Sequence, residues 1–351
     1  MNLVQRSIDI IKAGQSPSGG YVASPNFGEY AYSWLRDGSF IAYSMLVKGE
    51  TDSVAAFLTW TAKAVQSQQK KIEALKEAAA AGPLQEIAPE FQLPTRFSLD
   101  GEEVKDDWPN FQIDGYGAWL WLLAEWDSRG FAVQDLWRES AALTTDYLAI
   151  CWPHSCYDCW EEGGDSVHLS TLACVAGGLK AIASIAAVPE GLLETIEARI
   201  REGVVDGGYF AKSFGRNDVD SALLWLSVPF GVIPPQDAAM KATAEKIRQE
   251  LLEEGGVKRY LADTYYGGGL WVLLTGYLAW FEMARGNREE ALRLKQWMAE
   301  QATEDGSLPE QVTRHVNDAT YVEEWIERWG PIATPLLWSH ALYLVVDELV
   351  H

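Results

Sequence analysis

The sequence has 351 residues, of which 48% are hydrophobic and 22% charged, which is enough for one large domain or two ordinary ones and excludes wholesale disorder. No apolar run approaches the roughly 20 residues of a membrane span, and residues 1–15 lack the features of a secretion signal, so we expect a cytoplasmic protein without a membrane partner. The net charge of −22 repels phosphate backbones and no basic patch offsets it, so nucleic acid is not an expected partner.

Apolar residues have helical spacing along almost the whole chain, and alternating strand patterns are scarce. In chain order the spacing predicts helices near residues 2–14, 38–48, 52–80, 113–129, 134–151, 165–187, 190–202, 218–228, 236–254, 269–286, 288–303 and 334–349. Residues 81–110 and 311–333 look like long loops, and we expect them to roof a pocket. The predicted fold class is all-α.

The predicted helices are of two kinds that alternate along the chain. Those near 52–80, 190–202, 236–254 and 288–303 are amphipathic and charged, and those near 113–129, 165–187, 218–228, 269–286 and 334–349 are mostly apolar. A helix that is apolar all round is buried, whereas a one-sided helix lies on the outside. The alternation predicts six inner helices wrapped by six outer ones, an (α/α)6 toroid. We expect residues 1–351 to form one such domain, because no linker divides them.

Acidic, arginine and tryptophan residues gather just before each predicted inner helix. The clusters are Trp34-Leu-Arg-Asp37, Gln112-Ile-Asp-Gly115, Trp160-Glu-Glu162, Asp218-Val-Asp220, residues 259–266 and Glu310-Gln311. If the inner helices run parallel, all six clusters meet at one end of the barrel, where helix N-termini favour negative charge. A single acid in such a position also caps its own helix, which is the simpler interpretation of Asp218. Six clusters, three of which also contain Trp or Arg, favour a common site.

The cysteines and the other aromatic residues give weaker indications. Cys151, Cys156, Cys159 and Cys174 include one C-x-x-C pattern, but no second pair completes a zinc site, so we interpret them as buried thiols. No metal ion or cofactor is expected. The 16 Trp and 14 Tyr residues offer flat amphipathic faces that suit the C–H faces of sugars as well as a protein core.

Two of the clusters contain carboxyl groups suited to cleaving a glycosidic bond. That reaction needs one carboxyl group to protonate the departing oxygen and another to activate water or attack carbon. Glu161 lies near Asp158, Glu162 and Trp160, and like charges beside an apolar wall keep an acid protonated. Glu310 lies in a turn-like loop, where we expect it to stay hydrated and ionised as a base requires. Acid pairs are also common on protein surfaces, so the pattern alone leaves that alternative open.

Six motifs resemble those of glycoside hydrolase family 15, the glucoamylase family. In chain order they are Tyr30-Ala-Tyr-Ser-Trp-Leu-Arg-Asp37, Trp108 with Gln112-Ile-Asp-Gly115, Cys156-Tyr-Asp-Cys-Trp-Glu-Glu162, Arg259-Tyr-Leu-Ala-Asp-Thr-Tyr-Tyr266, Leu308-Pro-Glu-Gln311 and Pro335-Leu-Leu-Trp-Ser-His-Ala341. They occur in family order and span nearly the whole chain. The resemblance implies hydrolysis of α-glucosides.

Carried over by position, the resemblance implies a role for each matching residue. Glu161 would be the general acid, and Glu310 the general base that activates water. The implied substrate-binding residues are Arg36, Asp37 and Arg259 at the hydroxyls of the terminal glucose, Tyr30 and Trp34 lining that subsite, Trp108 near the acid, and Trp160 and Glu162 at the next unit. Trp338 and His340 are interpreted as core residues.

The expected substrate is a short α-gluco-oligosaccharide of the isomaltose or maltose type. The sequence departs from the family pattern at Leu35 and at Gly267-Gly-Gly-Leu-Trp271, beside the expected pocket, which leaves the linkage open. It contains neither the N-terminal β-sandwich of many prokaryotic relatives nor a starch-binding module, which favours short substrates over granular starch. The oligomeric state is not predicted.

These inferences together predict an inverting, exo-acting hydrolase that releases β-glucose from the non-reducing end of short α-glucosides. A trehalase is the alternative within the same family. A catalytically silent sugar-binding protein on the same toroid is a different class, and the presence of both Glu161 and Glu310 argues against it. A terpene cyclase would need an Asp-rich motif such as Asp-x-Asp-Asp, which the sequence lacks.

Overall fold

The computed structural model describes residues 2–351, and Met1, the first residue of the predicted domain, lies outside the described residues. The α-helices are α1 Leu3–Ala13, α2 Leu35–Val47, α3 Thr51–Ser67, α4 Gln69–Ala81, α5 Asp114–Ser128, α6 Asp135–Cys151, α7 Leu169–Ile182, α8 Leu192–Arg201, α9 Ala238–Leu251, α10 Val272–Ala284, α11 Arg288–Glu300, α12 Thr320–Trp329 and α13 Leu337–Val350. The 3₁₀-helices are η1 Gly28–Tyr30, η2 Pro89–Phe91, η3 Ser221–Leu226 and η4 Tyr265–Gly267. The strands are β1 Ser33–Trp34, β2 Arg96–Phe97, β3 Leu252–Glu253, β4 Gly256–Val257, β5 Leu270–Trp271 and β6 Gln311–Val312.

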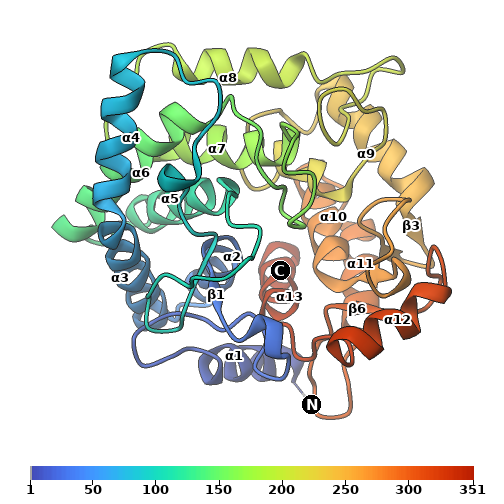
Figure 1. The fold of residues 1–351 in the computed structure, drawn as a ribbon. Helices are drawn as coiled ribbons and strands as arrows, with labels where there is room; N and C mark the ends of the chain where they lie inside the picture. The colour runs from blue at the N-terminus through green and yellow to red at the C-terminus, as the bar shows by residue number, and fades with distance from the viewer. Residues whose placement is uncertain (1) are drawn as a thin grey trace.

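An inner ring of helices closes on itself. α2 packs against α5, α5 against α7, α7 against η3, η3 against α10, α10 against α13, and α13 returns to α2. Most residues of α5 and α10 are buried, as their apolar character on all sides requires. The predicted all-α toroid, with an inner ring built from the six expected segments, is therefore confirmed (Figure 1).

The outer layer consists mainly of amphipathic helices packed on this ring. α1 contacts α13, α3 contacts α2, α6 contacts α5 and α7, α8 contacts α7, α9 contacts η3, and α11 contacts α10 and α13. Figure 1 shows α1, α3, α8 and α9 towards the outside, with α2 and α13 near the centre. On α8 the buried residues are Ile196 and Ile200, four residues apart and so on one helix face. Within residues 2–351, no helix is long and apolar enough to cross a membrane.

Three predicted segments differ from the structure. Residues 52–80 form two helices, α3 and α4, which meet at Gln68; one straight helix of that length would extend about 43 Å, well beyond the inner helix it covers. Residues 218–228 form the 3₁₀-helix η3, which ends before Pro229, a residue without the amide hydrogen that a continuing helix needs. Residues 311–333 are not only a loop, because they contain α12.

Short antiparallel strand pairs connect segments at the end of the ring where α2 and α10 begin. β1 pairs with β2, which brings Arg96 opposite Trp34. β5 pairs with β6, which brings Trp271 opposite Gln311. Trp34 and Trp271 are the N-cap residues of α2 and α10. The pairs therefore fix loop residues close to the first turns of two inner helices.

Helices α5 and α7 approach closely because two glycines face the contact. A Cβ atom on Gly117 would lie 2.3 Å from the carbonyl oxygen of Cys174, and one on Gly178 would lie 2.2 Å from the carbonyl oxygen of Gly117. Real side-chain carbons do not approach an oxygen so closely, so any side chain here would force the two helices apart.

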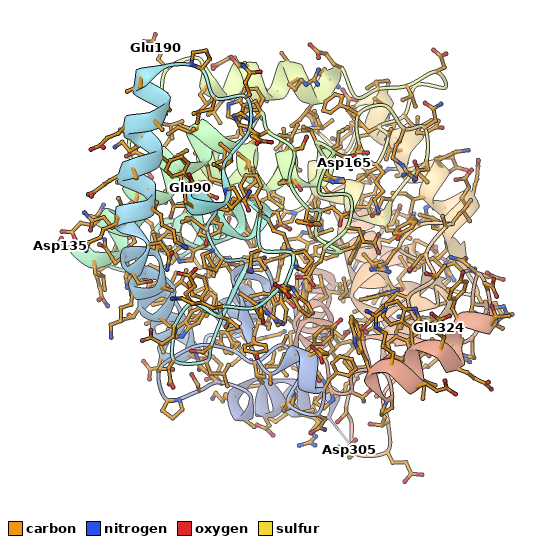
Figure 2. The ribbon with its side chains drawn as sticks, in the orientation of Figure 1. Glu90, Asp135, Asp165, Glu190, Asp305 and Glu324 are labelled. Atoms are coloured by element: carbon orange, nitrogen blue, oxygen red, sulfur yellow. The ribbon has the colours of Figure 1, made fainter. Side chains whose placement is uncertain are left out.

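Many carboxyl groups lie on the outside of the molecule, whereas the thiols lie inside. The acidic residues labelled in Figure 2 are all exposed: Glu90, Asp135, Asp165, Glu190, Asp305 and Glu324. The four cysteines are buried and free. The interpretation of the cysteines as buried thiols is confirmed.

Candidate active site

Four of the six predicted clusters line one pocket of about 410 Å³, whereas no residue of the clusters at 112–115 and 218–220 lines it. Every residue assigned to the site from the sequence lines this pocket: Tyr30, Trp34, Arg36, Asp37, Trp108, Trp160, Glu161, Glu162, Arg259 and Glu310. They come from η1, β1, the first turn of α2 and four separate loops. The closed ring of inner helices thus brings together side chains that are up to 280 residues apart, such as Tyr30 and Glu310.

Three nitrogen donors hold one oxygen of the Glu161 carboxyl group. Its Oε1 accepts hydrogen bonds from Trp34 Nε1 at 2.8 Å, Trp108 Nε1 at 2.8 Å and Gln112 Nε2 at 3.1 Å. The two indoles are themselves packed around Arg96, whose guanidinium lies 3.6 Å from the ring centre of Trp108 and 5.2 Å from that of Trp34. The carboxyl group is therefore fixed in orientation. Its second oxygen, Oε2, accepts none of these three hydrogen bonds.

The backbone at Glu161 is in the left-handed region, with φ of 69°. A non-glycine residue in this region costs about 1–3 kcal/mol and persists only where its surroundings enforce it. Asp158 supplies this enforcement, because its Oδ1 accepts hydrogen bonds from the amides of Trp160 at 2.9 Å and Glu162 at 3.0 Å. The amide of Glu161 in turn donates to the Asp158 carbonyl oxygen at 3.0 Å. Asp158 thus stabilises the strained backbone conformation that sets the orientation of Glu161.

Glu310 is buried, with 2% of its surface exposed, so the expectation that it stays hydrated is wrong. The reason is tertiary: the loop that carries it is covered by Tyr30 and Tyr265. Burial raises the pKa of Glu310 to about 8, against the lowering effect of the Tyr30 hydroxyl and the Arg259 guanidinium. Its Oε1 accepts a hydrogen bond from the Tyr30 hydroxyl at 3.0 Å, whereas its buried Oε2 has no partner among the described residues.

The start of α13 holds the loop that carries Glu310. The imidazole Nε2 of His340 accepts a hydrogen bond from the Leu308 amide at 2.9 Å, and its Nδ1 lies 2.9 Å from the Ser7 hydroxyl. Burial lowers the pKa of His340 to about 3, so the ring is neutral and can accept. The Ser339 hydroxyl donates to the Pro309 carbonyl at 2.8 Å. His340 is thus a core residue, as predicted, and it fixes the chain two residues before Glu310.

Arg36 and Asp37 both line the pocket, and their side chains have different partners. Arg36 Nη1 donates to Gln112 Oε1 at 2.8 Å and to Asp114 Oδ2 at 3.1 Å, whereas its Nε lies 3.5 Å from Asp37 Oδ2. Burial raises the pKa of Asp37 to about 7, although Arg36 opposes this effect. Arg36 also lies 5.9 Å from the ring centre of Trp338, so that this residue, predicted as core, forms part of the pocket wall.

Arg259 lines the pocket and is surrounded by aromatic rings. Its guanidinium is paired through two nitrogens with the Asp263 carboxylate and lies 3.6 Å from Glu162 Oε1. The ring centres of Trp160 and Trp271 are 5.2 and 5.3 Å away. Glu162 also accepts a hydrogen bond from the Tyr260 hydroxyl. This wall offers a planar cation and a half-exposed carboxylate beside two indole faces, a combination suited to sugar hydroxyls and C–H faces.

Helix α12 covers the pocket, as expected for residues 311–333, but its helical conformation was not predicted from the sequence. Trp325, Arg328 and Trp329 from α12 line the pocket, and the two indoles pack on Tyr265 at ring-centre distances of 5.0 and 6.0 Å. No residue of α12 is buried. The signal that would have revealed it is the pairing of Trp325 and Trp329 four residues apart, flanked by charged residues, which is the pattern of a one-faced helix.

Two further side chains that support the site lie outside the motifs found in the sequence. Arg96 holds the two indoles, and Lys212 contacts the loop of Glu161. Arg96 is 62 residues from Trp34 and Lys212 is 54 residues from Asp158, and no local spacing predicts such contacts. Tyr265, which bonds to Tyr30, lies within the motif at residues 259–266. Within residues 2–351, no three His, Cys, Asp or Glu side chains are arranged to hold a metal ion.

Comparison with known proteins gives matches along nearly the whole chain. The family model described as glycosyl hydrolases family 15 matches residues 1–347. The chain is 40% identical, over 358 aligned residues, to an isomaltose glucohydrolase of Kribbella flavida, and the match covers 99% of this chain and 92% of that protein. A solved wild-type glycosidase has a TM-score of 0.93 and 38% identity, with 99% of this chain and 96% of the other covered. A glycosidase variant in complex with glucose has a TM-score of 0.92 and 37% identity, with the same coverage.

Proposed function

The chain belongs to glycosyl hydrolases family 15 and is a glycoside hydrolase, and from this premise we propose that it is an inverting, exo-acting α-glucosidase. In this proposal it releases β-glucose from the non-reducing end of short α-glucosides. Glu161 is the general acid and Glu310 the general base. The observation that carries the proposal is that both carboxyl groups line one pocket in contrasting surroundings, Glu161 held by three N–H donors and Glu310 buried beneath two tyrosines.

The surroundings of Glu161 fit a proton donor with one defined proton position. Trp34 Nε1 and Trp108 Nε1 can only donate, so Oε1 of Glu161 is occupied as an acceptor. The proton of the acid form therefore resides on Oε2. In the proposed reaction this proton passes to the glycosidic oxygen while the bond from that oxygen to the anomeric carbon breaks.

The surroundings of Glu310 fit a base that acts on one water molecule. Its Oε1 accepts from Tyr30, which leaves the buried Oε2 as the atom that takes a proton from water. The resulting hydroxide oxygen forms a bond to the anomeric carbon on the face opposite the leaving group, which inverts the configuration and yields β-glucose. Such a route needs the two carboxyl groups about 6.5–9.5 Å apart, which leaves room for the water.

The other pocket residues support recognition of one sugar end. Arg36, Asp37 and Arg259 are buried charged groups that line the pocket and can exchange hydrogen bonds with glucose hydroxyls. Trp34 and Trp108 supply flat walls for C–H faces. We propose that a terminal glucose unit is enclosed by these groups and that Trp160, Glu162 and Arg328 contact the next unit.

We propose isomaltose as the preferred substrate among short α-glucosides. The support is the 40% identity to a protein named isomaltose glucohydrolase, with coverage of nearly both whole chains. A cavity of about 410 Å³ covered by α12 also suits a small ligand, since pockets for small molecules are about 300–1,000 Å³.

Anomer-resolved proton NMR tests the reaction and the linkage together. The purified protein is mixed with isomaltose, maltose, kojibiose, nigerose or trehalose, and the anomeric signals are followed before mutarotation is complete. We expect the glucose from the non-reducing end to appear first as β-glucose, in excess over the anomers that the leaving unit supplies, and fastest from isomaltose. An early excess of α-glucose beyond the amount supplied by the leaving unit would contradict inversion, fastest release from trehalose would make the protein a trehalase, and no release from any of them would contradict the proposed α-glucosidase activity.

Single substitutions test the two assigned residues. Glu161→Gln and Glu310→Gln are each expected to lower kcat on the preferred disaccharide by several orders of magnitude without unfolding the protein, because the reaction loses its proton donor or acceptor. Asp165→Asn is the matched control, since Asp165 is an exposed carboxylate on the same loop as Glu161. A near-wild-type rate for either glutamine variant would remove that residue from its role.

A further inference from the structure

Lys212 is a buried cation that the proposed reaction does not use. It lies on the loop between α8 and η3, and 8% of its surface is exposed. Its Nζ atom is 3.1 Å from Asp220 Oδ2 and 3.2 Å from Asp158 Oδ2, and it lies 3.6 Å from the ring centre of Tyr260. A buried ammonium group is retained only where such partners offset its desolvation, and here both aspartates are themselves buried.

Both aspartates hold the loop that presents Glu161. Asp158 Oδ1 accepts the amides of Trp160 and Glu162, the residues on either side of Glu161, and so maintains its left-handed backbone. Asp220 Oδ2 accepts a hydrogen bond from the Trp160 indole at 2.8 Å. Glu161 itself makes no contact with Lys212 within hydrogen-bond distance, so any effect of the lysine on it passes through these groups and through Glu162, whose Oε2 lies 3.8 Å from Lys212 Nζ.

The positive charge of Lys212 helps the two aspartates to remain hydrogen-bond acceptors. Burial raises the pKa of Asp220, and the positive charge of Lys212 acts against this rise. In Asp158, Oδ1 binds the two amides while Oδ2 faces Lys212, so the lysine also fixes which oxygen is turned to the loop. Without the cation, two buried carboxylates would face each other, and protonation or rotation of one would release the strained turn at Glu161.

We propose that Lys212 is a positioning residue for the general acid: through Asp158 and Asp220 it holds the loop at residues 158–162 so that Glu161 Oε2 meets the leaving oxygen. This inference rests on the proposed role of Glu161. It assigns Lys212 to the protonation of the leaving group and not to glucose binding or to the action of Glu310.

The test compares two substrates that differ in their need for an acid. Isomaltose has a poor leaving group that must be protonated, whereas α-glucosyl fluoride loses fluoride with little help from an acid. For Lys212→Met we expect kcat on isomaltose to fall by about 10- to 100-fold, as for a displaced catalytic group, with KM nearly unchanged. On α-glucosyl fluoride we expect a loss below about 3-fold. Lys258→Met is the matched control, because Lys258 is equally buried but paired with Glu253 away from the pocket.

Further variants keep the test decisive. Lys212→Arg retains the cation and is expected to recover part of the isomaltose rate. If Lys212→Met does not fold, Lys212→Met with Asp220→Asn removes one charge of each sign and is expected to show the same selective loss, with folding checked by circular dichroism. Equal losses on both substrates, or no loss on isomaltose, would overturn the role of Lys212.

The Glu161→Gln variant separates failure of this inference from failure of the proposed function. If it loses activity on isomaltose and keeps it on α-glucosyl fluoride, Glu161 is the acid, and the Lys212 result then tests the positioning role alone. If it is equally active on both substrates, the assignment of the acid fails and the positioning role fails with it.

Discussion

At the scale of single residues, the two glutamates differ in what surrounds their oxygens. Glu161 Oε1 is held by two indoles and an amide, whereas Glu310 is held by one hydroxyl in a buried position. The sequence predicts special surroundings for the acid and a hydrated base. The structure reverses the second expectation, because burial raises the pKa of Glu310 to about 8.

Tyr30→Phe is expected to move the acid limb of the kcat/KM profile to higher pH. Glu310 must be ionised to act as a base, so activity falls as pH falls through its pKa. The Tyr30 hydroxyl stabilises the carboxylate and lowers this pKa. Its loss is expected to raise the pKa by about one to two units, since hydrogen bonds to charged groups are worth about 1.5–3 kcal/mol.

The measurement is the pH dependence of kcat/KM with isomaltose for wild type and variant. Tyr209→Phe serves as control, because its hydroxyl donates to the Asn217 carbonyl outside the pocket. A limb that stays in place, or that moves to lower pH, would show that Tyr30 does not act on the ionisation of Glu310.

At the scale of elements, α12 covers the pocket while contributing no buried residue of its own. Trp329→Ala is therefore expected to raise KM for isomaltose about 10-fold, since stacking contacts of this kind are worth about 1 kcal/mol or more, while Tm changes little. Ile326→Ala is the matched control on the same helix, because Ile326 is 44% exposed. A fall in Tm with unchanged KM would instead make α12 a structural element.

The contact between α5 and α7 makes a second prediction at this scale. Gly117→Ala is expected to lower the free energy of unfolding by about 1–3 kcal/mol, because overpacking against the Cys174 carbonyl outweighs the helix propensity gained, about 1 kcal/mol. Urea unfolding measures the difference. Gly28→Ala is the control, since a Cβ atom there would meet no atom within 4 Å. A stabilised Gly117→Ala variant would mean that the two helices can separate at no cost.

At the scale of the whole molecule, the pocket makes stability depend on pH. Glu310 has a pKa of about 8 in the folded protein, above the ordinary 4.5 of an exposed glutamate. Folding favours the neutral form of Glu310. Its contribution to the free energy of unfolding is therefore complete below pH 4.5 and is lost as pH rises towards 8. Asp37, with a pKa raised to about 7, acts in the same direction. Glu310 and Asp37 thus lower the free energy of unfolding at neutral pH.

Glu310→Gln is accordingly expected to be more stable than wild type at pH 7, by up to about 3 kcal/mol, and nearly equal to it at pH 4.5. Urea unfolding at the two pH values measures the difference, and Asp165→Asn is the control with an exposed carboxylate. A stability gain that is the same at both pH values would show that the ionisation of Glu310 is not its source.

Much of the architecture could be predicted because it depends on local patterns. Apolar residues on all sides of α5 and α10, and on one side of α8, set which segments lie inside and which outside. The position of the acid and Trp clusters before the inner helices then predicted that they share one end. The ten assigned residues do line one pocket.

The sequence by itself determined the helical layers and the set of residues at their N-terminal ends, because side-chain polarity repeats with the period of the helix. Only the tertiary structure decided the surroundings of each carboxyl group. The burial of Glu310 beneath Tyr30 and the contact of Asp158 and Lys212 on the Glu161 loop join segments far apart in the chain. The physical reason is that desolvation and charge pairing depend on distances in space, and separations along the chain do not fix those distances.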